Sequence, residues 1–371
     1  MTALPLPSAA NAALRALAGD FVAGKMPALA RAVSTVENRR EGSDLLLAAL
    51  HPRIGRARRI GITGPPGAGK STLATLLASE MRKAGLTVGI VAVDPTSPFT
   101  GGALLGDRVR MESVALDPGI FIRSMATRGS LGGLAATTRE VCDVLDAFGV
   151  DRILVETVGV GQSELDIART VDSCVVVLTP ESGDGIQAMK AGLMEIADLF
   201  VVNKADRPGA DRVRNDLELM LGLRGGQALK GSPAHHGIDL TLAANPANPV
   251  KGVRAAARRA DADAWAPPVL RAVGTTAEGI LDLLAALDRH FAYLERSGTL
   301  KTRRRARLRE RVVDVAEQRI RKRLWNDPAT NAWIDGRIPE LEDGRTTPYA
   351  VANALLAQSG PLLTGAGEPE R

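Results

Sequence analysis

Short apolar runs alternate with longer segments of helical period through the middle of this chain. The runs are rich in Val, Ile and Leu, which is typical of parallel strands that are covered on both faces. The seven runs lie at 59–63, 87–93, 120–125, 152–156, 173–179, 199–203 and 268–273. Between most of them, apolar residues recur three or four positions apart and predict helices. The alternation therefore predicts an α/β fold with a mostly parallel central sheet flanked by helices.

Helical patterns also extend to both ends of the chain. Three helices are predicted before the first strand, at 11–18, 26–40 and 43–50. Ser43 is the expected N-cap of the third, because a hydroxyl there can accept a hydrogen bond from the first helical turn. The predicted parts are an N-terminal helical extension (1–55), an α/β domain (56–290) and a C-terminal helical arm (291–371). Residues 222–266 have no clear period and are interpreted as a surface insertion in the α/β domain.

Length and composition fit a cytoplasmic protein. With 371 residues, the chain can form one large α/β domain with extensions. It has no run of about 18 apolar residues, so no membrane span is predicted, and its first residues do not read as a secretory signal. Cys142 and Cys174 fall in a predicted helix and a predicted strand. We expect them to be buried small side chains rather than a disulfide or a metal pair.

The first predicted strand leads into a glycine-rich segment that begins at Gly64. Its pattern, G-x-x-x-x-G-K-S, is that of the phosphate-binding loop of nucleoside triphosphatases, in which backbone N–H groups surround phosphate oxygens. The residues expected to hold the phosphates are Gly64, Pro65, Pro66, Gly67, Ala68, Gly69, Lys70, Ser71 and Thr72. Lys70 can reach the β- and γ-phosphates, and the Ser71 hydroxyl can bind Mg²⁺. Because the positive end of the next helix also faces this loop, we expect a nucleoside triphosphate there.

The segment Asn203-Lys-Ala-Asp206 follows another predicted buried strand and indicates which base is bound. The Asp206 carboxylate can accept two hydrogen bonds from the N1–H and the exocyclic amine of guanine. Adenine has no such donor pair on that edge, so a site built for guanine would leave Asp206 unpaired with ATP. The stem of Lys204 can pack over the base, and Asn203 can join this loop to the phosphate-binding loop. GTP is therefore favoured over ATP.

A third motif contains Glu156, which closes the strand at 152–156 and is followed three residues later by Gly159. This is the layout of a γ-phosphate sensor, with the carboxylate near Mg²⁺ and the Gly159 N–H near the γ-phosphate. The next residue is Val160, whereas Ras-like enzymes carry at that place a glutamine that positions the attacking water. We therefore expect slow unaided hydrolysis of GTP to GDP.

The stretch from Lys301 to Arg323 is strongly basic and leaves two interpretations open. One is an arm that binds nucleic acid. The other is a helix that packs against a partner subunit, because an apolar stripe repeats every four positions. The stripe consists of Leu308, Val312, Ala316, Ile320 and Leu324. No aromatic residues lie among the charges, as base stacking would favour, so the partner subunit is preferred and no nucleic acid is expected.

Several motifs together carry a family resemblance. The segments are 64–72, 93–111, 122–135, 155–164, 181–198 and 203–206. They resemble the GTPases associated with methylmalonyl-CoA mutase, of the MeaB/ArgK/MMAA type, within the SRP–MinD–BioD class. The most discriminating is RSMATRGSLGG (123–133), which has no role in generic GTPases. The resemblance covers nearly all of the α/β domain and implies a P-loop fold whose helical C-terminal arm forms a homodimer.

The resemblance also implies roles for residues that spacing alone does not assign. Asp94 and Asp107 are similar to switch I carboxylates near Mg²⁺, beside Ser71 and Glu156. Asp94 could instead cap the turn at the end of its strand, and Asp107 could be the N-cap of a helix at 108–116. The segment 180–190 resembles a third switch loop. Its Lys190 would stabilise transition-state charge, although an exposed helical lysine is the alternative reading.

The function that the resemblance implies is a GTPase chaperone for a B12-dependent acyl-CoA mutase. Such a protein gates the delivery of adenosylcobalamin and protects the mutase, and an adenosyltransferase would be a further partner. The chain departs from the family in its last guanine-binding loop, where the typical Ser-Ala pair is missing. The base contacts are therefore placed only loosely, at Val273, Gly274 and Thr275. Together with the long 222–266 segment, this departure points to a sister mutase, such as one acting on isobutyryl-CoA or 2-hydroxyisobutyryl-CoA.

Two other functions are alternatives to the chaperone. Nickel metallochaperone GTPases carry Cys/His metal motifs, but neither cysteine of this chain neighbours a histidine. The His235–His236 pair lies in the predicted insertion, where exposure to solvent is the simpler expectation. The other alternative is a small-molecule kinase or a transport ATPase. Both would use ATP, whereas the segment 203–206 favours guanine over adenine.

Overall fold

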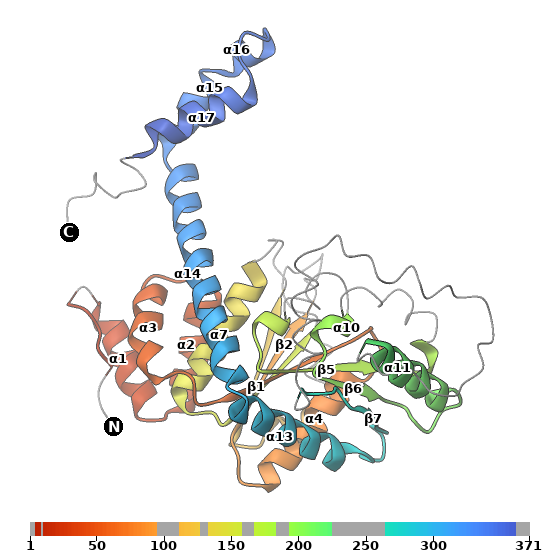
Figure 1. The fold of residues 1–371 in the computed structure, drawn as a ribbon. Helices are drawn as coiled ribbons and strands as arrows, with labels where there is room; N and C mark the ends of the chain where they lie inside the picture. Colours follow the sequence, from red (N-terminus) through yellow and green to blue (C-terminus); the bar gives the residue numbers. More distant parts are fainter. Residues whose placement is uncertain are drawn as a thin grey trace. The chain divides into compact units, whose positions relative to one another are not determined.

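The computed structural model describes residues 4–8, 10–94, 111–126, 133–157, 167–182, 193–224 and 264–360. It divides into two compact units, residues 1–303 and 304–371 (Figure 1). The division falls within α14 (Thr299–Trp325), later than the boundary at 290/291 that the sequence predicts. The N-terminal helices belong to the same compact unit as the sheet.

The described residues of the first unit form a seven-stranded parallel sheet of order β3-β2-β4-β1-β5-β6-β7. The strands are β1 (Arg58–Thr63), β2 (Val88–Asp94), β3 (Ile120–Ala126), β4 (Arg152–Thr157), β5 (Ser173–Leu178), β6 (Leu199–Val202) and β7 (Val269–Arg271). All seven predicted strands are confirmed. Since every strand runs the same way, the residues that follow β1, β4, β5, β6 and β7 meet at one edge of the sheet.

Most strands supply side chains to two hydrophobic cores, because successive residues of a strand point to opposite faces. In β2, Ile90 belongs to the core beneath α4 (Lys70–Lys83) and α13 (Ile280–Arg296). Its neighbour Val91 belongs to the core beneath α7 (Gly133–Phe148). A smaller core lies between β5, β6 and α11 (Ala210–Arg224). Helices therefore cover both faces, as Figure 1 shows, and the predicted fold class is confirmed.

Three N-terminal helices pack against α7 and extend the core that lies beneath that helix. They are α1 (Ala12–Val22), α2 (Met26–Glu37) and α3 (Ser43–Leu50), and a short 3₁₀ turn, η1 (His51–Arg53), follows them. The prediction of Ser43 as the N-cap of α3 is wrong. The cap is Gly42, at φ 81°, and Ser43 is the first helical residue. The chain turns here in the left-handed region, which glycine adopts without strain.

The remaining elements of the first unit are short. They are α6 (Glu112–Ala115), η2 (Ile167–Arg169), η3 (Pro180–Ser182) and α10 (Leu193–Ile196). Of the helix expected at 108–116, the described part is helical only in α6. Most of the predicted insertion, residues 225–263, lies outside the described residues. Cys142 in α7 and Cys174 in β5 are both buried, as expected.

The described part of the second unit, residues 304–360, contains the rest of α14 and three further helices. These are α15 (Pro328–Asp335), α16 (Ile338–Glu342) and α17 (Pro348–Gln358). Side chains cap two of them: Asp327 accepts from the Ala329 N–H, and Thr347 accepts from the Ala350 N–H. Within the ranges that the structure describes, no helix of either unit is both long and apolar enough to cross a membrane.

A buried polar cluster lies at the other edge of the sheet, around the Asp198 carboxylate that precedes β6. Arg303 donates to both Asp198 oxygens, at 3.1 and 2.9 Å, and the Cys174 N–H donates at 3.0 Å. His290 Nε2 lies 3.3 Å from the same carboxylate without forming a well-directed hydrogen bond. Burial alone would raise the pKa of Asp198, but His290 and Arg303 outweigh it and hold the pKa below its usual range. The first turn of α14 is thus anchored to the foot of β6.

Candidate nucleotide-binding site

The glycine-rich segment forms a tight loop between β1 and α4. Gly64 has φ 134°, and a Cβ on it would lie 2.0 Å from the Val177 carbonyl oxygen. Gly69, at φ 86°, is the residue before α4, and a Cβ there would lie 2.3 Å from Asn203 Nδ2. Both positions require glycine for their backbone angle and for space. The loop therefore packs directly against β5 and against the loop after β6.

Lys70 and Ser71 open α4 and are both buried. Lys70 Nζ donates to the carbonyl oxygens of Gly64 and Pro65, at 2.9 and 3.0 Å, so its ammonium group lies across its own loop. Ser71 Oγ donates to Glu156 Oε1 at 2.6 Å. A cation, the first N–H groups of a helix and a hydroxyl thus converge at one edge of the sheet. This is an arrangement that attracts phosphate.

The oxygen donors at this edge fit Mg²⁺. Mg²⁺ is bound in such sites by one or two protein oxygens, phosphate oxygens and water. The Ser71 hydroxyl and the buried Glu156 carboxylate already face each other. Asp94 closes β2 at the same edge, because Val93 of β2 is paired with Thr157 of β4. Asp107, the other predicted ligand, lies outside the described residues, as do Gly159 and Lys190.

Asn203 joins three loops. Its Nδ2 donates to the Ala68 carbonyl oxygen at 2.8 Å, so the expected connection between the two nucleotide loops is present. Its Oδ1 accepts from the Gly274 N–H at 3.1 Å, which adds the loop after β7. Gly274 also lies close to Thr72, whose Cγ2 would be 3.1 Å from an added Cβ. The predicted phosphate-binding and base-binding segments therefore meet around one buried amide.

The segment that carries Asp206 is braced by residues that the sequence analysis did not assign. Arg271 Nη2 donates to the Ala205 carbonyl oxygen at 3.1 Å, and the Ala205 N–H donates to the Ala272 carbonyl oxygen at 3.0 Å. Lys204 has φ 55°, and Asp206 itself is exposed. The sequence signal for Arg271 was its place within the predicted strand 268–273, two residues before the loosely placed base contacts. A bond to a backbone carbonyl 66 residues away leaves no local pattern.

An ion pair ties the same segment to the end of β5. Arg207, which directly follows Asp206, pairs with Glu181 in η3. The hydrogen bond from Arg207 lowers the pKa of Glu181 to about 2. Both side chains are about half exposed, so the pair adds little to stability. It does connect the predicted base-binding loop to the start of the 180–190 segment.

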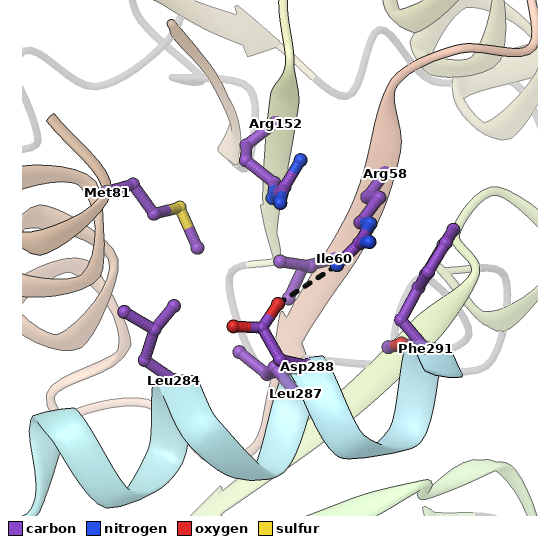
Figure 2. A pocket seen from close by; sticks show the side chains of 9 residues that line it. Arg58, Ile60, Met81, Arg152, Leu284, Leu287, Asp288 and Phe291 are labelled. Carbon is purple, nitrogen blue, oxygen red and sulfur yellow. Dashed lines mark hydrogen bonds and ion pairs between the residues drawn. The ribbon is translucent and has the colours of Figure 1, made fainter. Parts of the chain in front are cut away.

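A small hollow at the opposite edge of the sheet is separate from this site (Figure 2). Arg58 of β1 forms an ion pair with Asp288 of α13 at 2.9 Å, and its guanidinium lies 4.1 Å from the centre of the Phe291 ring. Arg152 is its neighbour on β4, and burial and then the Arg58 charge lower the Arg152 pKa. This cluster fastens α13 to the foot of the sheet.

Comparison with known proteins identifies the family. The family model described as "Methylmalonyl Co-A mutase-associated GTPase MeaB" matches residues 29–329. The chain belongs to this family. A Pyrococcus horikoshii protein assigned as a GTPase is 43% identical over 333 residues, which cover 90% of this chain and 94% of that protein. The mouse protein named methylmalonic aciduria type A homolog, mitochondrial, is 31% identical over 300 residues, covering 80% and 64%.

A solved structure agrees with the MeaB assignment. The crystal structure of a LAO/AO transport system kinase matches with a TM-score of 0.61 and 25% identity, over 94% of this chain and 99% of that one. The resemblance drawn from the motifs is therefore confirmed, together with the P-loop fold. As a MeaB-family GTPase, the chain binds guanine nucleotides.

Proposed function

We propose that this MeaB-family GTPase is a chaperone that gates adenosylcobalamin loading of a B12-dependent acyl-CoA mutase and protects or reactivates that enzyme. The observation that carries the proposal is the match of residues 29–329 to a family described by its association with methylmalonyl-CoA mutase. The mouse relative, named for methylmalonic aciduria, points to the same metabolism. Adenosylcobalamin is the cargo, and an adenosyltransferase would supply it.

The residues at the carboxyl edge of the sheet have the following roles in this proposal. The phosphate-binding loop holds the β- and γ-phosphates, with Lys70 as the counter-charge, and Asp206 pairs with guanine. Ser71 and Glu156 hold Mg²⁺, joined by Asp94 and Asp107. When bound, Mg²⁺ neutralises charge on the phosphate oxygens. The Gly159 N–H contacts the γ-phosphate, and Lys190 stabilises the charge that develops on it.

Hydrolysis by the isolated protein is slow, and the mutase accelerates it. The support is chemical: Val160 occupies the place of the glutamine that positions water in Ras-like enzymes. A GTPase without that side chain holds its GTP until another group completes the site. The nucleotide then reports whether the mutase is ready to receive its cofactor. The chain acts as a homodimer, so that two nucleotide sites serve one assembly.

The decisive experiment adds purified mutases to the full-length GTPase one at a time. Methylmalonyl-CoA, isobutyryl-CoA and 2-hydroxyisobutyryl-CoA mutases are compared for co-elution, for acceleration of GTP hydrolysis and for GTP-dependent loading of adenosylcobalamin. We expect one of them to satisfy all three criteria, and Lys70→Ala to abolish the loading step. If none binds and none changes the hydrolysis rate, the chaperone proposal is wrong.

A further inference from the structure

A hydrogen bond between two hydroxyl groups joins the end of β1, which leads into the phosphate-binding loop, to the end of its neighbour β4. Thr157 Oγ1 donates to Thr63 Oγ1 over 2.9 Å, and both side chains are buried, with exposed fractions of 3% and 0%. The backbone pairing of β1 with β4 ends at Ile62 and Glu156. The threonine pair therefore adds a side-chain connection one residue beyond the last backbone pair.

Each threonine is the chain neighbour of a residue in the nucleotide site. Thr63 directly precedes Gly64, where φ is 134° and the backbone packs so closely against β5 that no side chain fits. Thr157 directly follows Glu156, whose Oε1 accepts from Ser71. The threonine pair and the Ser71–Glu156 bond are thus two adjacent connections between the phosphate-binding loop and β4.

Stability does not explain why hydroxyl groups occupy this position. Replacing both partners of a buried hydrogen bond with apolar groups of the same shape is nearly neutral for folding. Valine has the shape of threonine, and the neighbouring Ile62 and Val155 are already buried apolar side chains. A pair of valines would fill the space without needing a partner.

What only the hydroxyl pair supplies is a short distance between the two side chains. Its oxygens are 2.9 Å apart, whereas apolar carbons pack at about 3.5–4.0 Å. In a pair of valines the nearest side-chain atoms would therefore lie roughly 0.6–1.1 Å farther apart than the two hydroxyl oxygens do. A shift of about 1 Å in a catalytic site can cost about 10²-fold in rate.

We infer that Thr63 and Thr157 are positioning residues for GTP hydrolysis. They set the distance between the phosphate-binding loop and the strand that delivers Glu156 and the chain beyond it. The inference rests on the GTPase activity of the family and does not depend on a mutase. Nucleotide affinity should change little, because the Asn203 bonds to Ala68 and Gly274 involve neither threonine.

The test compares single-turnover GTP hydrolysis and GDP affinity in the full-length protein without any mutase. Thr63→Val, Thr157→Val and the double variant should each hydrolyse GTP about 10–100-fold more slowly. Their GDP affinity should stay within about threefold of the unmutated protein. Either single change breaks the same bond, so the effects should not add. Thr157→Ser keeps the hydroxyl and should keep a rate close to that of the unmutated protein.

Thr330→Val is the matched control. It removes another buried threonine hydroxyl, one that donates to Asp327 in the second unit, and should leave hydrolysis unchanged. Melting temperatures separate a rate effect from a loss of fold, because the double variant leaves no hydroxyl unpaired and should melt near the unmutated protein. Hydrolysis at the unmutated rate by the double variant would overturn the inference. So would a Thr157→Ser variant as slow as Thr157→Val. Cobalamin loading is assayed separately, so failure of the chaperone proposal leaves this result interpretable.

Discussion

Asn203 shows how one buried side chain can organise a binding site. Its amide donates to the phosphate-binding loop and accepts from the loop after β7, so both of its polar ends are used. An added Cβ on Gly69 would lie 2.3 Å from Asn203 Nδ2, which explains why that turn carries no side chain. The amide thus positions the phosphate-binding loop and the loop after β7 against one another.

Asp206→Asn should change the base preference. The carboxylate is expected to accept two hydrogen bonds from guanine, and each charge-assisted bond is worth about 1.5–3 kcal/mol. GTP affinity should fall roughly ten- to a hundred-fold for each lost bond, and xanthosine triphosphate should bind better than before. Calorimetric titration with GTP, ATP and xanthosine triphosphate measures this. Asp216→Asn, an exposed acidic position on α11, is the control and should change nothing. Equal affinity of the unmutated protein for ATP and GTP would contradict the assignment of Asp206 as the residue that selects guanine.

Lys70→Ala should abolish measurable hydrolysis. The ammonium group lies across the loop, bonded to the carbonyl oxygens of Gly64 and Pro65, and is expected to meet the β- and γ-phosphates. Losing such a charge should lower the rate by about 10³-fold and weaken triphosphate binding more than diphosphate binding. Lys83→Ala, at the exposed end of the same helix, should behave like the unmutated protein. Phosphate release under single-turnover conditions is the measurement. A Lys70→Ala protein that retains its rate would remove Lys70 from the mechanism.

The elements of this fold were predictable where the signal is local. All seven strands follow from apolar runs, and the phosphate-binding loop follows from eight contiguous residues. The N-cap of α3 was not predictable in this way. Ser43 is a good N-cap by residue type, but the N-cap in the structure is Gly42. The connections that link elements were also missed. Thr63 and Thr157 are 94 positions apart, and Asp198 and Arg303 are 105 apart, so no sequence period records them.

Arg303 illustrates the difference between composition and structure. In the sequence it belongs to a run of basic residues and reads as part of a solvated face. In the structure it donates to both oxygens of Asp198 and to the Asp172 carbonyl oxygen. The attraction of Asp198 outweighs burial and raises the pKa of Arg303. This pair anchors the first turn of α14 to the sheet.

Arg303→Met should destabilise the first unit by about 2 kcal/mol. Breaking a fully buried pair costs about 3–5 kcal/mol, and the estimate is reduced because the Arg303 side chain is 38% exposed. The loss should appear as a lower melting temperature in full-length protein at pH 7. Arg305→Met, an exposed position two residues later, is the control. An unchanged melting temperature for Arg303→Met would show that the pair does not hold the two elements together.

The penalty of Arg303→Met should also depend on pH. The pKa of Asp198 is lowered in the folded protein, so its contribution is fully present above the unfolded value of about 3.9. It is lost as the pH falls through the lower, folded value, because the carboxylate is then protonated and no longer attracts Arg303. The melting temperatures of the unmutated protein and of Arg303→Met should therefore converge as the pH is lowered below about 4. A difference that stays constant into that range would assign the effect to lost packing rather than charge.

We predict that the apolar stripe of α14 governs how the protein assembles. Leu308, Val312 and Ile320 are exposed in the single chain, with Val312 at 71%. An apolar stripe on an otherwise charged helix is expected to be covered, and a second copy offers a matching stripe through two-fold symmetry. We predict a homodimer formed mainly by the C-terminal arm, in which two nucleotide sites are coupled to one mutase assembly. Because Arg303 belongs to the first unit, the arm is best removed after residue 303.

Leu308→Glu combined with Val312→Glu should convert the dimer to a monomer. Facing stripes would bring four carboxylates into an apolar interface, and burying unpaired charge is costly enough to exceed the gain from the remaining contacts. Light scattering at micromolar concentration measures the mass, and GTP affinity should be unchanged because the nucleotide site lies within the first unit. Gln318→Glu combined with Thr302→Glu adds the same charge to α14 outside the stripe and should leave the dimer intact. A monomer mass for the unmutated protein would contradict the predicted homodimer. A dimer that survives the stripe variant would place the interface elsewhere.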